Sequence, residues 1–205
     1  MGTQRIPGSE TARLRHGGGA LPLRTGRLIL RAPTAADAPA VTALAGTWAI
    51  ARFTASIPHP LSQQDVQDWI RLAEVRHAEG TGVVLLIGAR PADTVMGAMD
   101  LRWGGTWPSA EVGYWIGSPF QGRGHASEAL AAVIGLAFGP LALEEVFASA
   151  TPDNAASLRV LAKAGLRPDG RTLVVPAPAR GTTWRHDRRA LTRAAWTAQT
   201  QDTHP

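Results

Sequence analysis

The stretch that decides the fold is EVGYWIGSPFQGRGHASEALAA, which runs from Glu111 to Ala132. Large apolar residues occupy both sets of alternating positions over residues 111–116, which is typical of an interior β-strand. The Gly-Ser-Pro sequence at 117–119 ends this strand, because proline cannot donate to a ladder. A glycine-containing turn and an Ala/Leu-rich helix-forming run follow. Such a turn at a helix N-terminus presents free N–H groups on the positive end of the helix dipole, so the stretch predicts an anion site, most naturally for phosphate.

Two common nucleotide-binding motifs do not fit this turn. The P-loop requires a Gly-Lys-Ser/Thr ending, but the single lysine of the chain, Lys163, lies far from the turn. The dinucleotide fingerprint requires a third glycine where this chain has Ser127. Its acidic residue would follow about 20 positions later. Glu144 stands there, but before the next predicted strand rather than at its end.

The turn instead resembles the pyrophosphate-binding loop of the GNAT superfamily of acetyltransferases. The pattern of that loop is Gln/Arg-x-x-Gly-x-Gly/Ala, and Gln121, Gly124 and Ala126 fill it here. Flanking segments resemble the RimJ/RimL-type branch: TGRLILR at 25–31, EVGYW at 111–115, and NAAS and VLAKAGL within 154–166. The resemblance covers roughly residues 24 to 193. It implies the GNAT fold, an α/β (α+β) architecture whose mixed, mostly antiparallel sheet has about six to seven strands with helices on both faces.

The periodicity along the chain predicts the order strand, two helices, three strands, helix, strand, helix, two strands. The strands are expected over residues 28–30, 83–87, 95–103, 111–116, 146–150, 173–175 and 183–191. Residues 1–20 contain few large apolar side chains, so we expect a flexible N-terminal tail. A single domain is expected over 21–196, followed by a short flexible tail over 197–205.

Composition narrows the class of protein. A hydrophobic content of 44% in 205 residues is enough for a sizeable core. The absence of cysteine excludes disulfides, thiolate metal sites and cysteine nucleophiles, and the six histidines are scattered, so we expect no metal. No charge-free run of 18 apolar residues and no apolar signal region occur in the sequence. We therefore expect a soluble, cytoplasmic protein with no membrane partner.

The net charge of +5 is unevenly placed. Residues 1–31 and 167–193 each carry +5, whereas residues 32–166 carry −4. These basic segments are either solvated arginine-rich faces or a surface that meets an acidic partner. Segment 167–193, which includes Arg185 and Arg188, favours an acidic peptide as acceptor. The carboxylates of Asp65, Asp68, Glu74 and Glu79 favour a cationic acceptor instead.

The resemblance implies that acetyl-CoA is the co-substrate. In the family, the loop strand and the next strand splay apart and the pantetheine inserts between them, which corresponds here to residues 111–116 and 146–150. Contacts to the cofactor are then expected from the following residues: Trp115, Ile116, Gln121, Gly122, Arg123, Gly124, His125, Ala126 and Asn154. Arg123 is either a charge-assisted phosphate ligand or a solvated loop arginine. His125 is expected to contribute its backbone, and Asn154 also suits a simple helix cap.

Two residues are expected to carry the chemistry. Glu111 resembles the carboxylate that related enzymes aim at the acceptor amine, so it is the expected base; the alternative is a structural acid paired with an arginine. Ser157 resembles the residue that faces the thioester sulfur and protonates the leaving thiolate. Many relatives use a tyrosine as this acid, farther along the same helix. The one tyrosine of this chain, Tyr114, lies on the loop strand instead.

The sequence therefore predicts an acetyl-CoA-dependent N-acetyltransferase, a monomer or homodimer, that acts on a primary amine. One acceptor is the N-terminal α-amine of a protein such as a ribosomal protein. The alternatives are a small-molecule amine (an amino acid, a polyamine or an aminoglycoside) or a non-catalytic acyl-CoA-binding module. Nucleic-acid binding is disfavoured, because no aromatic stacking platform accompanies the basic segments.

Overall fold

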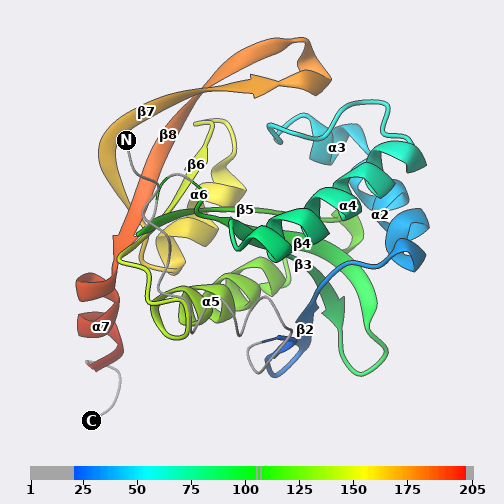
Figure 1. The fold of residues 1–205 in the computed structure, drawn as a ribbon. Helices are drawn as coiled ribbons and strands as arrows, with labels where there is room; N and C mark the ends of the chain where they lie inside the picture. The colour runs from blue at the N-terminus through cyan, green and yellow to red at the C-terminus, as the bar shows by residue number, and fades with distance from the viewer. Residues whose placement is uncertain (1–20, 105, 107, 202–205) are drawn as a thin grey trace.

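The computed structural model describes residues 21–104, 106 and 108–201. Over these residues the chain forms an eight-stranded sheet with helices on both faces (Figure 1). The tail predicted over residues 1–20 and the end of the chain, 202–205, lie outside the described residues. None of the helices in the described part is long and apolar enough to span a membrane.

The secondary structure follows the predicted order closely. The elements are β1 (Leu23–Arg24), β2 (Leu28–Arg31), η1 (Ala35–Asp37), α2 (Ala38–Ala45), α3 (Trp48–Ala51), α4 (Gln63–Glu79), β3 (Gly82–Ala89), β4 (Thr94–Arg102), β5 (Ser109–Ile116), η2 (Ser118–Phe120), α5 (His125–Phe138), β6 (Glu145–Ala150), α6 (Ala155–Lys163), β7 (Arg167–Ala177), η3 (Pro178–Arg180), β8 (Thr182–Thr192) and α7 (Arg193–Gln201). The mixed α/β architecture is confirmed.

Three details differ from the prediction. The sheet has eight strands rather than six to seven, because β1 is only two residues long and leaves no periodic signal. Strand β7 has 11 residues rather than three, since its prolines and glycine hid a strand that β8 pairs along most of its length. Helix α7 continues to Gln201, so residues 197–201 are helical rather than part of the expected tail.

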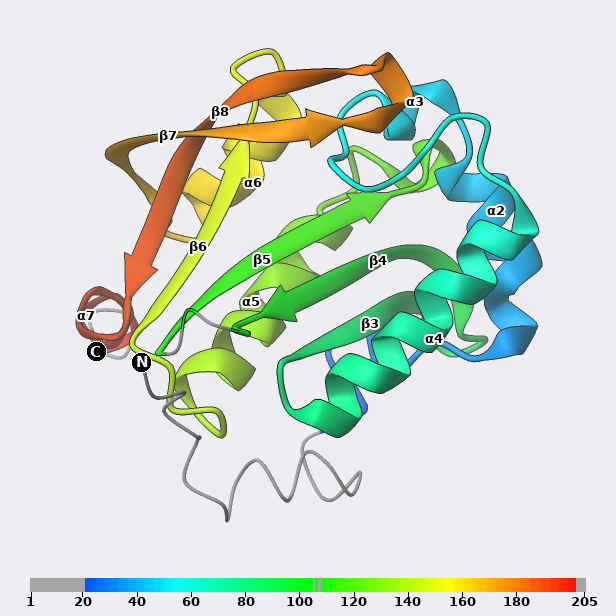
Figure 2. The ribbon, with the colours of Figure 1, turned by 45° about the horizontal axis from the view of Figure 1, so that its top comes forward.

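The strand order is β1-β2-β3-β4-β5-β6-β8-β7. Strands β5 and β6 form the parallel pair, and they are paired only over Ser109–Glu111 and Glu145–Phe147. Beyond Glu111 and Phe147 the two strands no longer pair with each other, although β5 continues to Ile116 beside β4 and β6 to Ala150 beside β8. Figure 2 shows them diverging from their common end, with the β7–β8 hairpin crossing beyond β6. The predicted splay is therefore present, and it divides the sheet into two halves.

A separate apolar core lies on each face of the sheet. Helix α5 covers one face and contributes Leu130 and Val133 to the larger core. Helices α2 and α4 cover the other face, where Val66 and Ile70 pack at helical spacing against Leu86. Because side chains alternate along a strand, β5 presents one set of residues to each core. This alternation decides which face of the sheet each residue of the site occupies.

Candidate active site

A cleft of about 1340 Å³ opens where β5 and β6 part. Its walls come from both cores and from the segment between α3 and α4. Of the expected site residues, the following line it: Glu111, Trp115, Ile116, Gln121, Gly122, Gly124, His125, Ala126, Asn154 and Ser157. The structure therefore brings together residues that the sequence spreads over 47 positions. Arg123 is absent from the described residues that line the cleft, so its proposed phosphate contact stays a prediction.

The glycine-rich turn leads directly into α5. Gly122 and Gly124 have φ angles of 75° and 80°, in the left-handed region where a side chain would be strained. Gln121 closes the turn from the other side, since its Nε2 donates to the carbonyl oxygen of Ile116 at 2.7 Å. The ring of His125 is held against the backbone, with Nδ1 3.2 Å from the carbonyl oxygen of Phe120. The first N–H groups of α5 are thus presented at the cleft, as an anion site requires.

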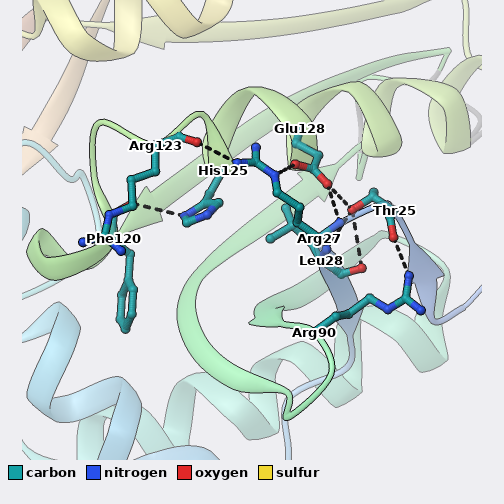
Figure 3. A network of polar contacts seen from close by, with 8 residues as sticks. All are labelled: Thr25, Arg27, Leu28, Arg90, Phe120, Arg123, His125 and Glu128. Carbon is teal, nitrogen blue, oxygen red and sulfur yellow. Dashed lines mark hydrogen bonds and ion pairs between the residues drawn. The ribbon is translucent and has the colours of Figure 1, made fainter.

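The turn between β1 and β2 holds this loop in place (Figure 3). Arg27 Nη1 donates to the carbonyl oxygen of Arg123 at 3.0 Å, and its Nε donates to Glu128 Oε2 at 2.7 Å. Glu128 Oε1 accepts from the hydroxyl of Thr25 at 2.5 Å. Burial alone would raise the pKa of Glu128, but the hydrogen bonds from Thr25 and Arg27 outweigh it and hold that pKa below its usual value. Two segments about 100 residues apart are therefore joined at the loop.

Glu111 faces the half of the cleft that α4 covers. Its Oε2 lies 3.0 Å from Nη2 of Arg102, and its side chain is 33% exposed. The pairing of β4 with β5 sets Arg102 directly opposite Glu111, and Arg102 also binds Asp100. The carboxylate is therefore both accessible from the cleft and paired with an arginine, so it combines features of the two alternatives that the sequence left open.

Ser157 is positioned by two neighbours. Asn154 caps α6, because its Oδ1 accepts from the N–H of Ser157 at 3.1 Å. The hydroxyl of Ser157 lies 2.9 Å from the phenol oxygen of Tyr114. Burial raises the pKa of Tyr114 to about 12, with the Ser157 hydrogen bond acting weakly in the opposite sense. The phenol is therefore protonated at neutral pH and can donate to Ser157.

Glu111 and the Tyr114–Ser157 pair lie on opposite faces of β5. Tyr114 packs against the larger core and Trp115 against the second core, so residues of odd number, including Glu111, face α4. An extended ligand in the gap between β5 and β6 would therefore have the carboxylate of Glu111 on one side and the hydroxyl of Ser157 on the other. Trp115 and Ile116 line the gap beside it.

Three further residues of the cleft were missed from the sequence: Asp100, Arg102 and His186. Arg102 was missed because only the register of β4 against β5 shows that it lies opposite Glu111. His186 lies on β8 and is 6% exposed, with Nδ1 3.3 Å from the hydroxyl of Ser149. A single histidine within a predicted strand gives no indication in the sequence that its side chain is buried beside the cleft. Within the described part of the chain, no group of three or more His, Asp or Glu residues is placed to hold a metal ion.

The arginines that favoured an acidic acceptor do not line the cleft. Arg188 is 5% exposed and binds Glu145 at 2.6 Å and also Asp169. Arg185 donates to the hydroxyl of Thr172 instead. Asp65 and Asp68, which favoured a cationic acceptor, do line the cleft. Neither Arg185 nor Arg188 therefore supplies a positive charge to the lining of the cleft, and the acidic acceptor stays a prediction.

Comparison with known proteins agrees with this geometry. The family model of the acetyltransferase (GNAT) domain matches residues 27–167. The uncharacterized N-acetyltransferase YoaA of Bacillus subtilis is 29% identical over 149 residues, which is 72% of this chain and 84% of YoaA. The match to YnaD of the same organism is 35% identical over 60 residues, and covers 29% of this chain and 35% of YnaD.

Solved structures share the fold. Mycobacterium smegmatis RimJ in complex with CoA-disulfide superposes with a TM-score of 0.73 at 20% identity, covering 88% of this chain and 96% of RimJ. RimL, a ribosomal L7/L12 alpha-N-protein acetyltransferase in complex with coenzyme A, gives a TM-score of 0.69 at 20% identity, covering 85% of this chain and 98% of RimL. The predicted family is thereby confirmed: the chain belongs to the GNAT family of acetyl-CoA-dependent N-acetyltransferases.

Proposed function

We propose that this protein transfers the acetyl group of acetyl-CoA to the N-terminal α-amine of a polypeptide. The observation that carries the proposal is the parting of β5 and β6 immediately after Glu111. The opening lies between the α5 N-terminus, where an anion would bind, and the Tyr114–Ser157 pair. A single extended acetyl-CoA molecule could therefore contact the loop from Gln121 to Ala126 and also reach Glu111 and the Tyr114–Ser157 pair.

The loop suits a pyrophosphate. An added Cβ at Gly122 would meet nothing within 4 Å, so the backbone is open to a ligand there. The N–H groups of residues 122–126 would hold the pyrophosphate, with the α5 dipole adding to the attraction. Asn154 and Trp115 would line the path of the pantetheine through the gap. A volume of about 1340 Å³ accommodates such a cofactor together with an acceptor.

The residues of the cleft can then serve each step of acyl transfer. Acetyl-CoA supplies an activated thioester, so positioning contributes much of the rate. Glu111 attracts the acceptor ammonium and takes one proton from it, which frees the lone pair for attack. Ser157 gives a proton to the departing thiolate, and Tyr114 restores the serine hydroxyl. After attack, the nitrogen loses a second proton. That proton replaces the one that the Tyr114–Ser157 pair gave to the thiolate, so the protons balance.

The acceptor half of the cleft suits a cationic amine. Asp65, Asp68 and Glu111 line it together with the aromatic ring of Trp69. The fold shared with RimJ and RimL supports a polypeptide α-amine. A small polyamine is the second candidate, because the same carboxylates would bind its ammonium groups.

Turnover measurements on a set of amines test the proposal. Acetyl-CoA would be offered with peptides that have a free N-terminus, with spermidine, with free amino acids and with an aminoglycoside. We expect the highest kcat/KM for a peptide α-amine, and a loss in kcat of about 10²–10⁴ for Glu111→Gln. Acetylation of lysine side chains or of spermidine at a higher kcat/KM than any N-terminus would contradict the α-amine assignment.

A further inference from the structure

The buried imidazole of His186 has no role in the steps above, although it lines the same cleft. Strand β8 pairs with β6 up to Ala150, which lies opposite Asp187, so His186 stands just past the end of β6, beside the opening. The residue is only 6% exposed, and a buried polar ring requires a partner. Ser149 supplies one, with its hydroxyl 3.3 Å from Nδ1.

His186 and Glu111 lie on the same face of the sheet. Glu111 is paired with Phe147 across β5 and β6, and Ser149 lies two residues farther along β6, so all three side chains project to one side. The hydrogen bond to Ser149 brings the imidazole to that same side. Both side chains line the same cleft. The carboxylate of Glu111 favours the charged form of the ring, which opposes the effect of burial.

The ionisation of His186 suits a proton acceptor. Burial lowers its pKa from the usual value, and this effect outweighs the opposing influence of the carboxylates of Glu111 and Asp187. Of the arginines beside it on β8, Arg185 donates to the hydroxyl of Thr172, and Arg188 is bound to Glu145 and Asp169. The ring is therefore neutral at pH 7, and in the tautomer whose Nδ1–H donates to the hydroxyl of Ser149, Nε2 can accept a proton.

We propose that His186 takes up the proton that the acceptor amine loses at Glu111. The N–H bond of the ammonium breaks as a proton passes to the Glu111 carboxylate. An N–H bond then forms at Nε2 of His186, which yields an imidazolium and regenerates the carboxylate. Imidazole is ordinarily a stronger base than a carboxylate. The carboxylates of Glu111 and Asp187 favour the imidazolium and oppose the burial that disfavours it. The inference rests on the proposed acetyl transfer. In it, His186 returns Glu111 to the carboxylate form, which can then accept a proton from the next acceptor amine.

The test compares His186→Gln with the parent in kcat between about pH 5 and about pH 8. The probes are acetyl-CoA with an N-terminal alanine peptide, and acetyl-CoA with spermidine. We expect kcat of the variant to fall about 10²-fold at pH 7, with the gap narrowing as pH rises and free amine becomes abundant. The affinity for acetyl-CoA and the Tm should stay unchanged. His77→Gln, the same change on α4 away from the cleft, should reproduce the parent profile.

A pH profile of His186→Gln that parallels the parent would overturn the inference while leaving the acetyltransferase proposal intact. A parent protein that turns over neither amine would overturn both. A second measurement needs no acceptor: NMR titration of the His186 ring in the parent and in Glu111→Gln. We expect the pKa of the ring to fall further in the variant, because the carboxylate that favours imidazolium is gone. An unchanged pKa would mean that Glu111 cannot pass a proton to His186.

Discussion

The phenol of Tyr114 and the hydroxyl of Ser157 lie 2.9 Å apart, although 43 residues separate them in the chain. The contact joins β5 to α6 on the face of the sheet opposite to Glu111. In the proposed mechanism, the phenol of Tyr114 thus reaches the leaving group from β5 rather than from the helix after β6. The serine hydroxyl gains a donor that is itself shielded from solvent, which keeps the pair oriented toward the cleft.

The ionisation of Tyr114 can be measured alone, because it is the one tyrosine of the chain. Burial raises the pKa of Tyr114 to about 12. We expect the absorbance of tyrosinate to appear with a midpoint near that value while the protein stays folded. In Ser157→Ala the midpoint should rise further, since the hydrogen bond from Ser157 lowers the pKa. A midpoint at the ordinary value for a solvated tyrosine, about 10, would contradict the buried contact.

Tyr114 and Ser157 should act in series. We expect Ser157→Ala to lower kcat about tenfold, at or below the usual range for a general acid, because water can also protonate a thiolate. Tyr114→Phe should cost a few-fold, and the double variant should be no slower than Ser157→Ala alone. Losses that multiply in the double variant would show that the two hydroxyls act independently.

Gly124 should be required for binding acetyl-CoA. Its φ of 80° disfavours a side chain, and a valine there would stand where the backbone approaches the pyrophosphate. We expect Gly124→Val to weaken binding of acetyl-CoA by calorimetry at least tenfold. Gly170→Val is the matched control, because Gly170 has a φ of 79° on β7, away from the cleft. Equal loss of affinity in the two variants would assign the effect to backbone strain rather than to the loop.

The link between Glu128 and Arg27 should make the stability of the loop depend on pH. The pKa of Glu128 is lowered in the folded protein, so its stabilising contribution is present above the ordinary glutamate pKa and is lost as pH falls through the lowered value. As the pH is lowered through this acidic range, we expect the Tm of Glu128→Gln to fall less than the Tm of the parent. Parallel Tm curves for the two proteins would show that the network contributes nothing to this dependence.

Local features of the site could be predicted from the sequence. The loop from Gln121 to Ala126, the helix after it and the cap at Asn154 each depend on residues within one short window. Glycine conformation, helix propensity and capping are local properties, so a motif of six residues carries them. The splay of the strands followed from the family resemblance, and the short parallel pairing of β5 with β6 agrees with it.

Contacts that depend on strand register could not be predicted. Arg102 meets Glu111 because the two are directly opposite in the β4–β5 pair, and Gly113 leaves room for this arginine. An added Cβ at Gly113 would lie 2.6 Å from Asp100 Oδ1, which gives this glycine a packing reason that its sequence context does not reveal. His186 reaches the cleft only because β8 lies beside β6, a pairing of strands about 40 residues apart. Sequence periodicity identifies strands but not their partners.

The most direct test is to follow an isotope-labelled acetyl group from acetyl-CoA in the presence of a peptide with a free N-terminus. Mass spectrometry of the peptide should locate the label on the α-nitrogen, with one free CoA thiol released for each peptide acetylated. Both signals should fall together by about 10²–10⁴ in Glu111→Gln. Thiol release that is independent of the peptide, or label that never reaches an amine, would contradict acetyl transfer in this cleft.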